Sequence, residues 1–184
     1  MNSKEFENKV KELIDDLKGV SNDFGLGNTG DEFKIITQIF LYKFLNDKFA
    51  NEVKQLEPAL ADDDNWQQTL NNYKKDDYEM LLMQLSEGTA LLHPNHFISY
   101  LFHKQDEPNF ANLFDETLLN IAILNNDIFS VKEDDGSKIK LFDRLSEFVS
   151  VSKRDPFCKA IINKLVNFSF ERIFNEKYDF YATI

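Results

Sequence analysis

The hydrophobic positions of this chain recur with a helical period along most of its length. The strongest stretch is 29–49, TGDEFKIITQIFLYKFLNDKF, in which apolar side chains occur on nearly every side of a 3.6-residue helix. A helix with this pattern is buried, because no single surface stripe can contain all of its apolar residues. We therefore expect this segment to be the central helix, with the other elements packed around it.

The start of this predicted helix carries a capping signal. Thr29 and Glu32 have capping-box spacing, so the Thr29 hydroxyl is expected to accept from a first-turn amide. The Glu32 carboxylate is expected to accept from the Thr29 amide in return. Gly30 and Asp31 would then be the first two helical residues.

The remaining elements are also predicted to be helices. An amphipathic helix runs from the N-terminus to Gly19, which is expected to end it. Further helices are expected near 66–73 and 78–85. Met80 and Met83 in the second of these could form a binding surface, but adaptable filling of the core is favoured. Another helix should begin with Asp155 as its cap and Pro156 at its first position. The one exception is 128–141, where an Asp-Gly turn between apolar pairs predicts a small β-hairpin.

Composition supports an all-α fold in one domain spanning 1–184. The chain has only six Gly and four Pro, and its 42% hydrophobic content with 18 Phe is ample for one core. Cys158 is the single cysteine, which excludes an internal disulfide framework and favours a reducing cytoplasm. No signal peptide is expected, and no apolar run approaches the roughly 18 residues of a membrane span.

The central segment also carries a family resemblance. A first helix ending in Leu17-Lys18-Gly19, a loop, and a long helix containing 39–49, IFLYKFLNDKF, resemble the N-terminal helical domain of the modification subunit of type I restriction-modification systems. That family has an apolar FLK-L-D-F-like run, which this chain matches with Tyr42 inserted before the lysine. The run 178–184, YDFYATI, resembles the segment that leads into the family's catalytic domain. The stretch 55–87 shows no such resemblance.

The resemblance implies a role in an adenine-N6 DNA methyltransferase. Family enzymes bind S-adenosylmethionine through a glycine-rich strand-loop motif and hold a flipped adenine with an Asn-Pro-Pro-aromatic motif. Neither motif occurs in this sequence, so it implies a non-catalytic domain without its own cofactor, with the catalytic domain downstream. The implied partners are a second modification subunit, a specificity subunit, restriction subunits and DNA; no membrane is implied.

Net charge gives a competing hypothesis. The formal charge is −11, whereas a protein that binds nucleic acid alone normally presents a basic face. The chain could instead be an independent acidic helical module that binds a protein partner, even as a DNA mimic. The densest basic cluster is Lys153, Arg154, Lys159 and Lys164, with little acid between them in sequence. It predicts either phosphate contacts or an ordinary solvated helix face.

Three further patterns could suggest ligand sites. Gly25 to Gly30 matches G-x-G-x-x-G, but a helix and not a strand precedes it, which favours a tight connection over an anion site. His93, His96 and His103 could suggest structural zinc, but the sequence offers no convincing third and fourth ligand, which favours ordinary helix-start or surface histidines. Asp62-Asp63-Asp64 lacks the glycine and distal glutamate of a calcium loop, so helix capping is expected there.

Overall fold

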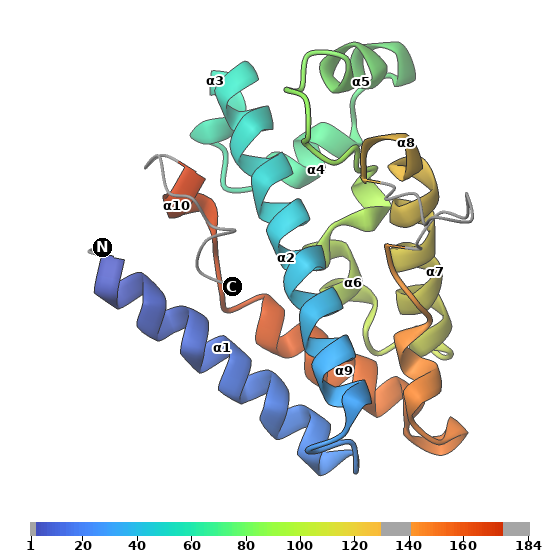
Figure 1. Cartoon of the computed structure of the whole chain (residues 1–184). Helices are drawn as coiled ribbons and strands as arrows, with labels where there is room; N and C mark the ends of the chain where they lie inside the picture. Colours follow the sequence, from blue (N-terminus) through green and yellow to red (C-terminus); the bar gives the residue numbers. More distant parts are fainter. Residues whose placement is uncertain (1–2, 130–140, 175–184) are drawn as a thin grey trace.

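A computed structural model describes residues 3–129 and 141–174, and every regular element within these ranges is helical, which confirms the predicted all-α fold (Figure 1). The α-helices are α1 (Ser3–Asp23), α2 (Gly30–Leu56), α3 (Pro58–Ala61), α4 (Trp66–Asn71), α5 (Lys75–Leu82), α6 (Ile98–Lys104), α7 (Phe110–Leu124), α8 (Asn126–Phe129), α9 (Arg154–Leu165) and α10 (Glu171–Phe174). The 3₁₀ turns are η1 (Pro94–His96), η2 (Leu145–Phe148) and η3 (Val151–Lys153).

Helix α2 begins at Gly30, as predicted, and Thr29 is its cap. The Glu32 amide donates to Thr29 Oγ1 at 3.2 Å, and Thr29 Oγ1 donates to the Leu26 carbonyl at 2.6 Å. The reciprocal half of the predicted capping box is wrong. Glu32 Oε2 accepts from the Asn28 amide at 3.0 Å, because the Thr29 amide donates to the Leu26 carbonyl.

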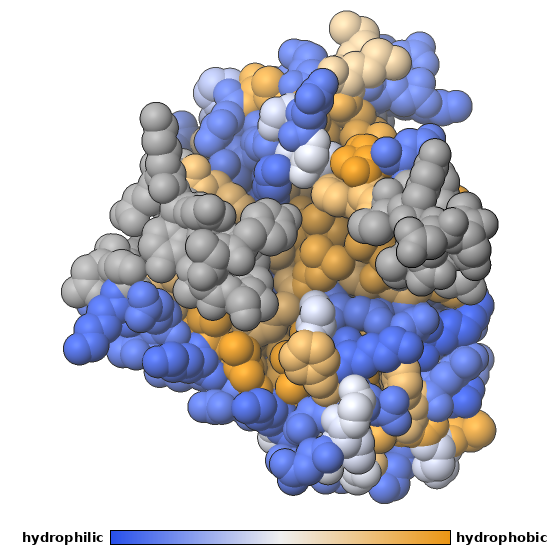
Figure 2. Space-filling model, in the orientation of Figure 1, coloured by the Kyte–Doolittle hydropathy of each residue, from blue (hydrophilic) through white to orange (hydrophobic). Residues whose placement is uncertain are grey.

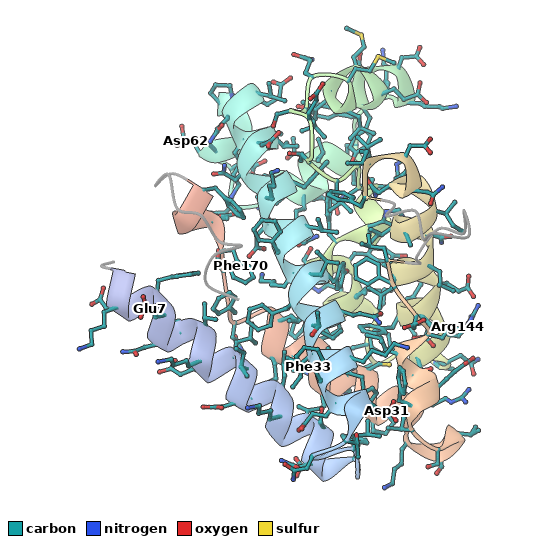
Figure 3. All side chains as sticks on the ribbon, in the orientation of Figure 1. Glu7, Asp31, Phe33, Asp62, Arg144 and Phe170 are labelled. Carbon is teal, nitrogen blue, oxygen red and sulfur yellow. The ribbon has the colours of Figure 1, made fainter. Side chains whose placement is uncertain are left out.

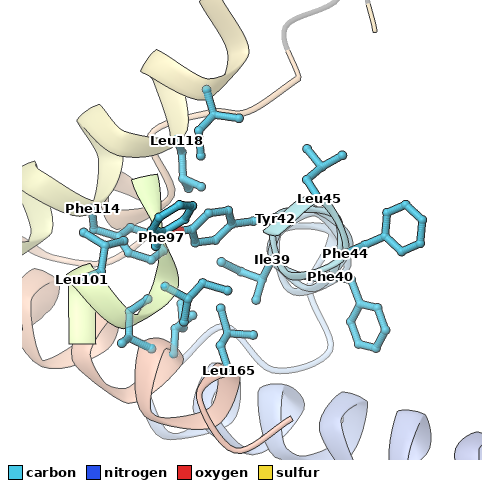
Figure 4. Close-up of a cluster of buried hydrophobic side chains, with 14 of the residues drawn as sticks. Ile39, Phe40, Tyr42, Phe44, Leu45, Phe97, Leu101, Phe114, Leu118 and Leu165 are labelled. Atoms are coloured by element: carbon cyan, nitrogen blue, oxygen red, sulfur yellow. The ribbon is translucent and has the colours of Figure 1, made fainter. Parts of the chain in front are cut away.

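Burial around α2 confirms its central position. Tyr42 points toward α6 and α7, whereas Phe40 and Phe44 leave the opposite side of the helix (Figure 4). The fully or nearly buried apolar residues of α2 are Ile35, Ile39, Phe40, Tyr42, Phe44, Leu45, Phe49, Ala50 and Val53. Phe33 also belongs to the apolar pattern of 29–49, but its side chain is 76% exposed, because the first turn of α2 extends past the core.

Helix α1 continues past Gly19 to Asp23, so the predicted end of this helix is wrong. Its core face extends by one more turn, because Val20 follows Leu17 at helical spacing and is only 6% exposed. Burying a valine contributes about 1.5–3 kcal/mol, whereas a glycine inside a helix costs about 1 kcal/mol relative to alanine. The burial of Val20 therefore outweighs the cost of Gly19.

Helix α9 packs against α1, α6, α7 and η2, so it connects the N-terminal helix to the helices that follow residue 87 in sequence. In Figure 1, α1 lies to the left of α2, α9 passes behind the lower half of α2, and α6 and α7 lie to the right. The apolar face of α9 is buried at Phe157, Cys158, Ile161, Ile162 and Leu165. This face orients the rest of the helix, including its basic residues.

Residues 57–87, which comprise α3, α4 and α5, form an end cap around the C-terminal end of α2 (Figure 1). The Glu52 side chain of α2 holds this cap, accepting from Ser86 Oγ at 2.6 Å and from Thr89 Oγ1 at 2.5 Å. Met80 and Met83 are 62% and 83% exposed, so the prediction that they fill the core is wrong. Tyr78 and Leu81 occupy the buried side of α5 instead.

The predicted β-hairpin is wrong at its first strand, because Ile128 and Phe129 belong to the short helix α8. Its turn and the rest of its strands up to Lys140 lie outside the described residues. Farther along, Leu145 and Phe148 are three residues apart, which is compatible with an α-helix, but they lie in the 3₁₀ turn η2. The family-like run 178–184 is also outside the described part of the chain.

The segment between α9 and α10 packs between α1 and α2. Phe170, labelled in Figure 3, is fully buried, and its ring lies 5.7 Å from that of Phe40 and 5.9 Å from that of Phe44. Its amide donates to Asp47 Oδ2 at 2.7 Å, and Asp47 Oδ1 pairs with Lys43 Nζ at 2.9 Å. A buried ion pair of α2 therefore anchors the C-terminal segment.

Candidate nucleic-acid interface

The four basic residues of the predicted interface lie at the start and along the outer side of α9. Lys153 ends η3 and Arg154 is the first residue of α9, two positions before the predicted first helical residue, Pro156. Lys159 and Lys164 follow on the same helix, about 140° apart at 100° per residue. The structure thus brings the four residues to one region without aligning them on one narrow stripe.

Acidic residues from other elements reach two of these cations. Lys159 Nζ pairs with Asp106, which follows α6, and Lys164 Nζ pairs with Asp16 of α1 at 3.0 Å. The lysine side chains remain 46% and 40% exposed. The sequence alone does not reveal these acidic partners, because they lie far away in the chain; Asp16, for example, is 148 residues from Lys164. The cluster is therefore less positive in the fold than along the chain.

The other two basic residues differ in exposure. Lys153 is exposed, and within 3–129 and 141–174 it has no ion pair. Arg154 is half-buried, and its Nε atom is buried without a hydrogen-bond partner in that part of the chain. Lys153 is thus the most accessible cation of the cluster, whereas packing restricts Arg154.

Asp155 has a different role from the one predicted. Its Oδ1 accepts from the Ala111 amide at 2.7 Å, so it caps the first turn of α7 and not its own helix. Pro156 is the third residue of α9, because the helix begins at Arg154. This contact fixes the basic end of α9 against the start of α7.

The three histidines do not form a metal site. His93 and His96 lie together, with ring centroids 5.3 Å apart, and the His93 amide donates to His96 Nδ1 at 3.2 Å. Burial, aided by the nearby His93, lowers the pKa of His96 to about 4. No group of three or more His, Cys, Asp or Glu suited to a metal ion occurs among the residues described above. His96 instead has a structural role, because its carbonyl accepts from the buried Tyr42 hydroxyl at 2.7 Å.

The aspartate run and the glycine run also have structural roles. Asp63 accepts from the Asn65 amide at 2.7 Å and from Thr69 Oγ1 at 2.5 Å, so it holds the turn before α4 against that helix. These hydrogen bonds, with Thr69 contributing most, lower the pKa of the Asp63 carboxyl. The predicted capping by the aspartate run is wrong, because Asn65 is the cap residue of α4 and no described side chain caps the first turn of this helix. Gly25 has φ +85° and belongs to the predicted tight connection between α1 and α2.

Comparison of the chain with protein-family models, curated proteins and solved structures found no match. None of the helices within 3–129 and 141–174 is both long and apolar enough to cross a lipid bilayer.

Proposed function

We propose that this chain is the N-terminal helical domain of a type I restriction-modification DNA methyltransferase subunit. The observation that carries the proposal is the sequence of 39–49, IFLYKFLNDKF, preceded by a shorter helix and a glycine-containing loop. In the structure this run occupies the middle of α2, and Lys43 and Asp47 within it are buried. A buried helical run of this kind forms the core of a helical domain. This supports the proposal that the chain and the N-terminal domain of the modification subunit have the same architecture.

The proposed domain takes part in DNA engagement and subunit assembly without carrying out catalysis. Its partners are the specificity subunit, a second modification subunit and the restriction subunits of the same cytoplasmic system. The Gly25–Gly30 run follows a helix, which is the wrong context for a dinucleotide-type loop. S-adenosylmethionine binding and base methylation are therefore assigned to a downstream domain.

Lys153, Arg154, Lys159 and Lys164 are the proposed phosphate contacts. The acid partners of Lys159 and Lys164 are themselves 80% and 52% exposed. Exposed ion pairs contribute only about 0–1 kcal/mol each, so a DNA phosphate can replace these carboxylates at small cost. Contacts of this kind position a duplex without reading its sequence.

A salt titration of the reconstituted methyltransferase tests the DNA contact. Lys159→Ala with Lys164→Ala should reduce the slope of log affinity against log salt by about two, equally for specific and unrelated DNA. Lys74→Ala with Lys75→Ala removes the same charge at the start of α5, at the other end of the molecule, and should leave the slope unchanged. An equal slope in both double variants would show that Lys159 and Lys164 do not contact DNA phosphates.

Two results would separate this function from a second candidate, an acidic protein-binding module or DNA mimic, which the net charge of −11 favours. A downstream coding sequence with an Asn-Pro-Pro-aromatic motif supports the methyltransferase. Competition of the isolated chain with DNA for a DNA-binding protein supports the mimic.

A further inference from the structure

The end cap, residues 57–87, contains much of the negative charge of the molecule. It has eight acidic and two basic side chains, a net charge of −6 within a total of −11. Figure 2 shows hydrophilic residues gathered at the end where Figure 1 places α5, with hydrophobic atoms exposed between them. A surface that combines acidity with exposed apolar groups suits a partner with the opposite charge and its own apolar side chains.

Helix α5 is anchored by one side and exposes the other. Tyr78 and Leu81 are 7% and 2% exposed, and Tyr78 Oη donates to the Leu92 carbonyl at 2.6 Å. Met80 and Met83, three residues apart, stand out from the molecule with most of their surface free. Methionine is flexible and polarisable, so an exposed pair adapts to an apolar partner.

A cleft of about 510 Å³ adjoins these methionines. Its lining includes Tyr73, Met80 and Leu81 as apolar walls and Glu57 and Asp77 as acidic ones. Burial raises the pKa of Tyr73, and the two acids raise it further, so their negative field reaches into the cleft. The lining also includes Lys74 and the uncharged polar residues Asn72 and Gln84. A partner side chain entering here would therefore meet an apolar floor whose charged border has two carboxylates and one lysine.

Several carboxylates of the cleft and of the first turn of α5 have no cation of their own. Lys75 Nζ pairs with Glu79 at 3.7 Å, but Glu57, Asp76 and Asp77 have no ion pair within the described ranges. Asp76 and Asp77 also stabilise the positive end of the α5 dipole. These free acids provide the charge complementarity for a basic partner.

We propose that α5 and the adjoining cleft dock a basic amphipathic helix of a partner protein. Apolar side chains of that helix pack on Met80, Met83 and Tyr73, and its lysines or arginines pair with Glu57, Asp76 and Asp77. This is helix-in-groove recognition, in which apolar anchors supply affinity and charge supplies steering. The inference goes beyond the proposed function and does not depend on it, because Figure 1 places α5 at the opposite end from the start of α9.

Methionine methyl NMR provides a direct test, because the chain contains only three methionines, Met1, Met80 and Met83. The probe is a synthetic peptide of leucine and lysine placed at helical spacing. Titration should shift the Met80 and Met83 methyl resonances saturably and leave Met1 unshifted. A peptide with serine in place of leucine and one with glutamate in place of lysine should each bind at least about tenfold more weakly.

Matched variants show whether binding depends on this surface. Met80→Ser with Met83→Ser should weaken peptide binding about tenfold, whereas Ile123→Ser, at a site 75% exposed on α7, should not. Asp76→Asn with Asp77→Asn should weaken it more than the same change at the exposed Asp15 and Asp23 of α1. Equal losses in test and control variants, or no saturable shift in the wild-type chain, would overturn the proposal.

Discussion

Replacing Lys43 with methionine should destabilise the protein by about 3–5 kcal/mol near neutral pH, because it leaves a buried carboxylate without its cation. The Lys43 and Asp47 side chains are each 8% exposed, so water cannot replace the lost partner. Among residues 3–129 and 141–174, the Phe170 amide is the one remaining group that would still compensate the Asp47 charge. The free energy of unfolding, measured by urea denaturation at 25 °C, checks the magnitude.

The matched control is Lys75→Met, which breaks a pair with the same four-residue spacing on α5. Lys75 and Glu79 are 85% and 52% exposed, so this loss should not exceed about 0.5 kcal/mol. Combining Lys43→Met with Asp47→Asn should recover most of the stability, because no buried charge remains while an oxygen still faces the Phe170 amide. Equal losses for Lys43→Met and Lys75→Met would refute the argument.

The pH dependence of the Lys43→Met variant follows from the direction of the Asp47 pKa shift. Burial raises the pKa of this carboxyl in the folded protein, and Lys43 opposes the rise. Without Lys43 the pKa should rise further, so the folded state binds a proton at a higher pH than the unfolded chain. The variant should therefore lose stability relative to wild type as the pH rises through the folded pKa. It should regain stability on acidification toward the ordinary aspartate pKa. A difference from wild type that does not grow as the pH rises above the ordinary aspartate pKa would contradict this assignment.

Four further predictions are open to measurement. Thr29→Ala should lower the free energy of unfolding by about 0.5–2 kcal/mol, and an unchanged denaturant midpoint would show that Thr29 is not the cap. Phe40→Ala should cost about 3–5 kcal/mol by leaving a cavity, whereas Phe33→Ala should cost less than about 1 kcal/mol because Phe33 is exposed. Asp155→Ala should cost about 0.5–2 kcal/mol and speed hydrogen exchange of the Ala111 amide, a local effect that a general loss of stability would not reproduce. Calorimetric titration of the chain with S-adenosylmethionine should give no saturable heat, and micromolar binding would refute the assignment of the cofactor to a downstream domain.

The central helix could be predicted from sequence because its signals are local. The Thr29 cap, the continuous apolar pattern after it and the loop before it all lie within a few turns of one another. The end of α1 could not be placed, because glycine usually marks a helix terminus and only tertiary packing shows that Val20 is buried. Met80 and Met83 were misassigned for a similar reason: a short apolar run does not show which side of its helix meets the core.

The candidate interface could be predicted only as a set of residues. The sequence identifies Lys153 to Lys164 as its densest basic cluster, but their partners come from α1 and the α6–α7 connection. Asp155 shows the same limitation, since its spacing from Pro156 suggests a local cap whereas its carboxylate binds an amide 44 residues away. Long-range ion pairs and hydrogen bonds leave no periodic signal.

The contact between the Phe170 amide and Asp47 has a consequence for the order in which the protein folds on the ribosome. It joins positions 123 residues apart, so a nascent chain can form α1 and α2 long before this contact is available. Until residue 170 has left the ribosome, Asp47 lacks the hydrogen bond from the Phe170 amide. The free-energy cost of closing this long loop is only slightly larger than that of a short one, because loop-closure entropy grows slowly with loop length. We therefore expect the core of this protein to remain protease-sensitive during synthesis and to become resistant only when its last described segment docks.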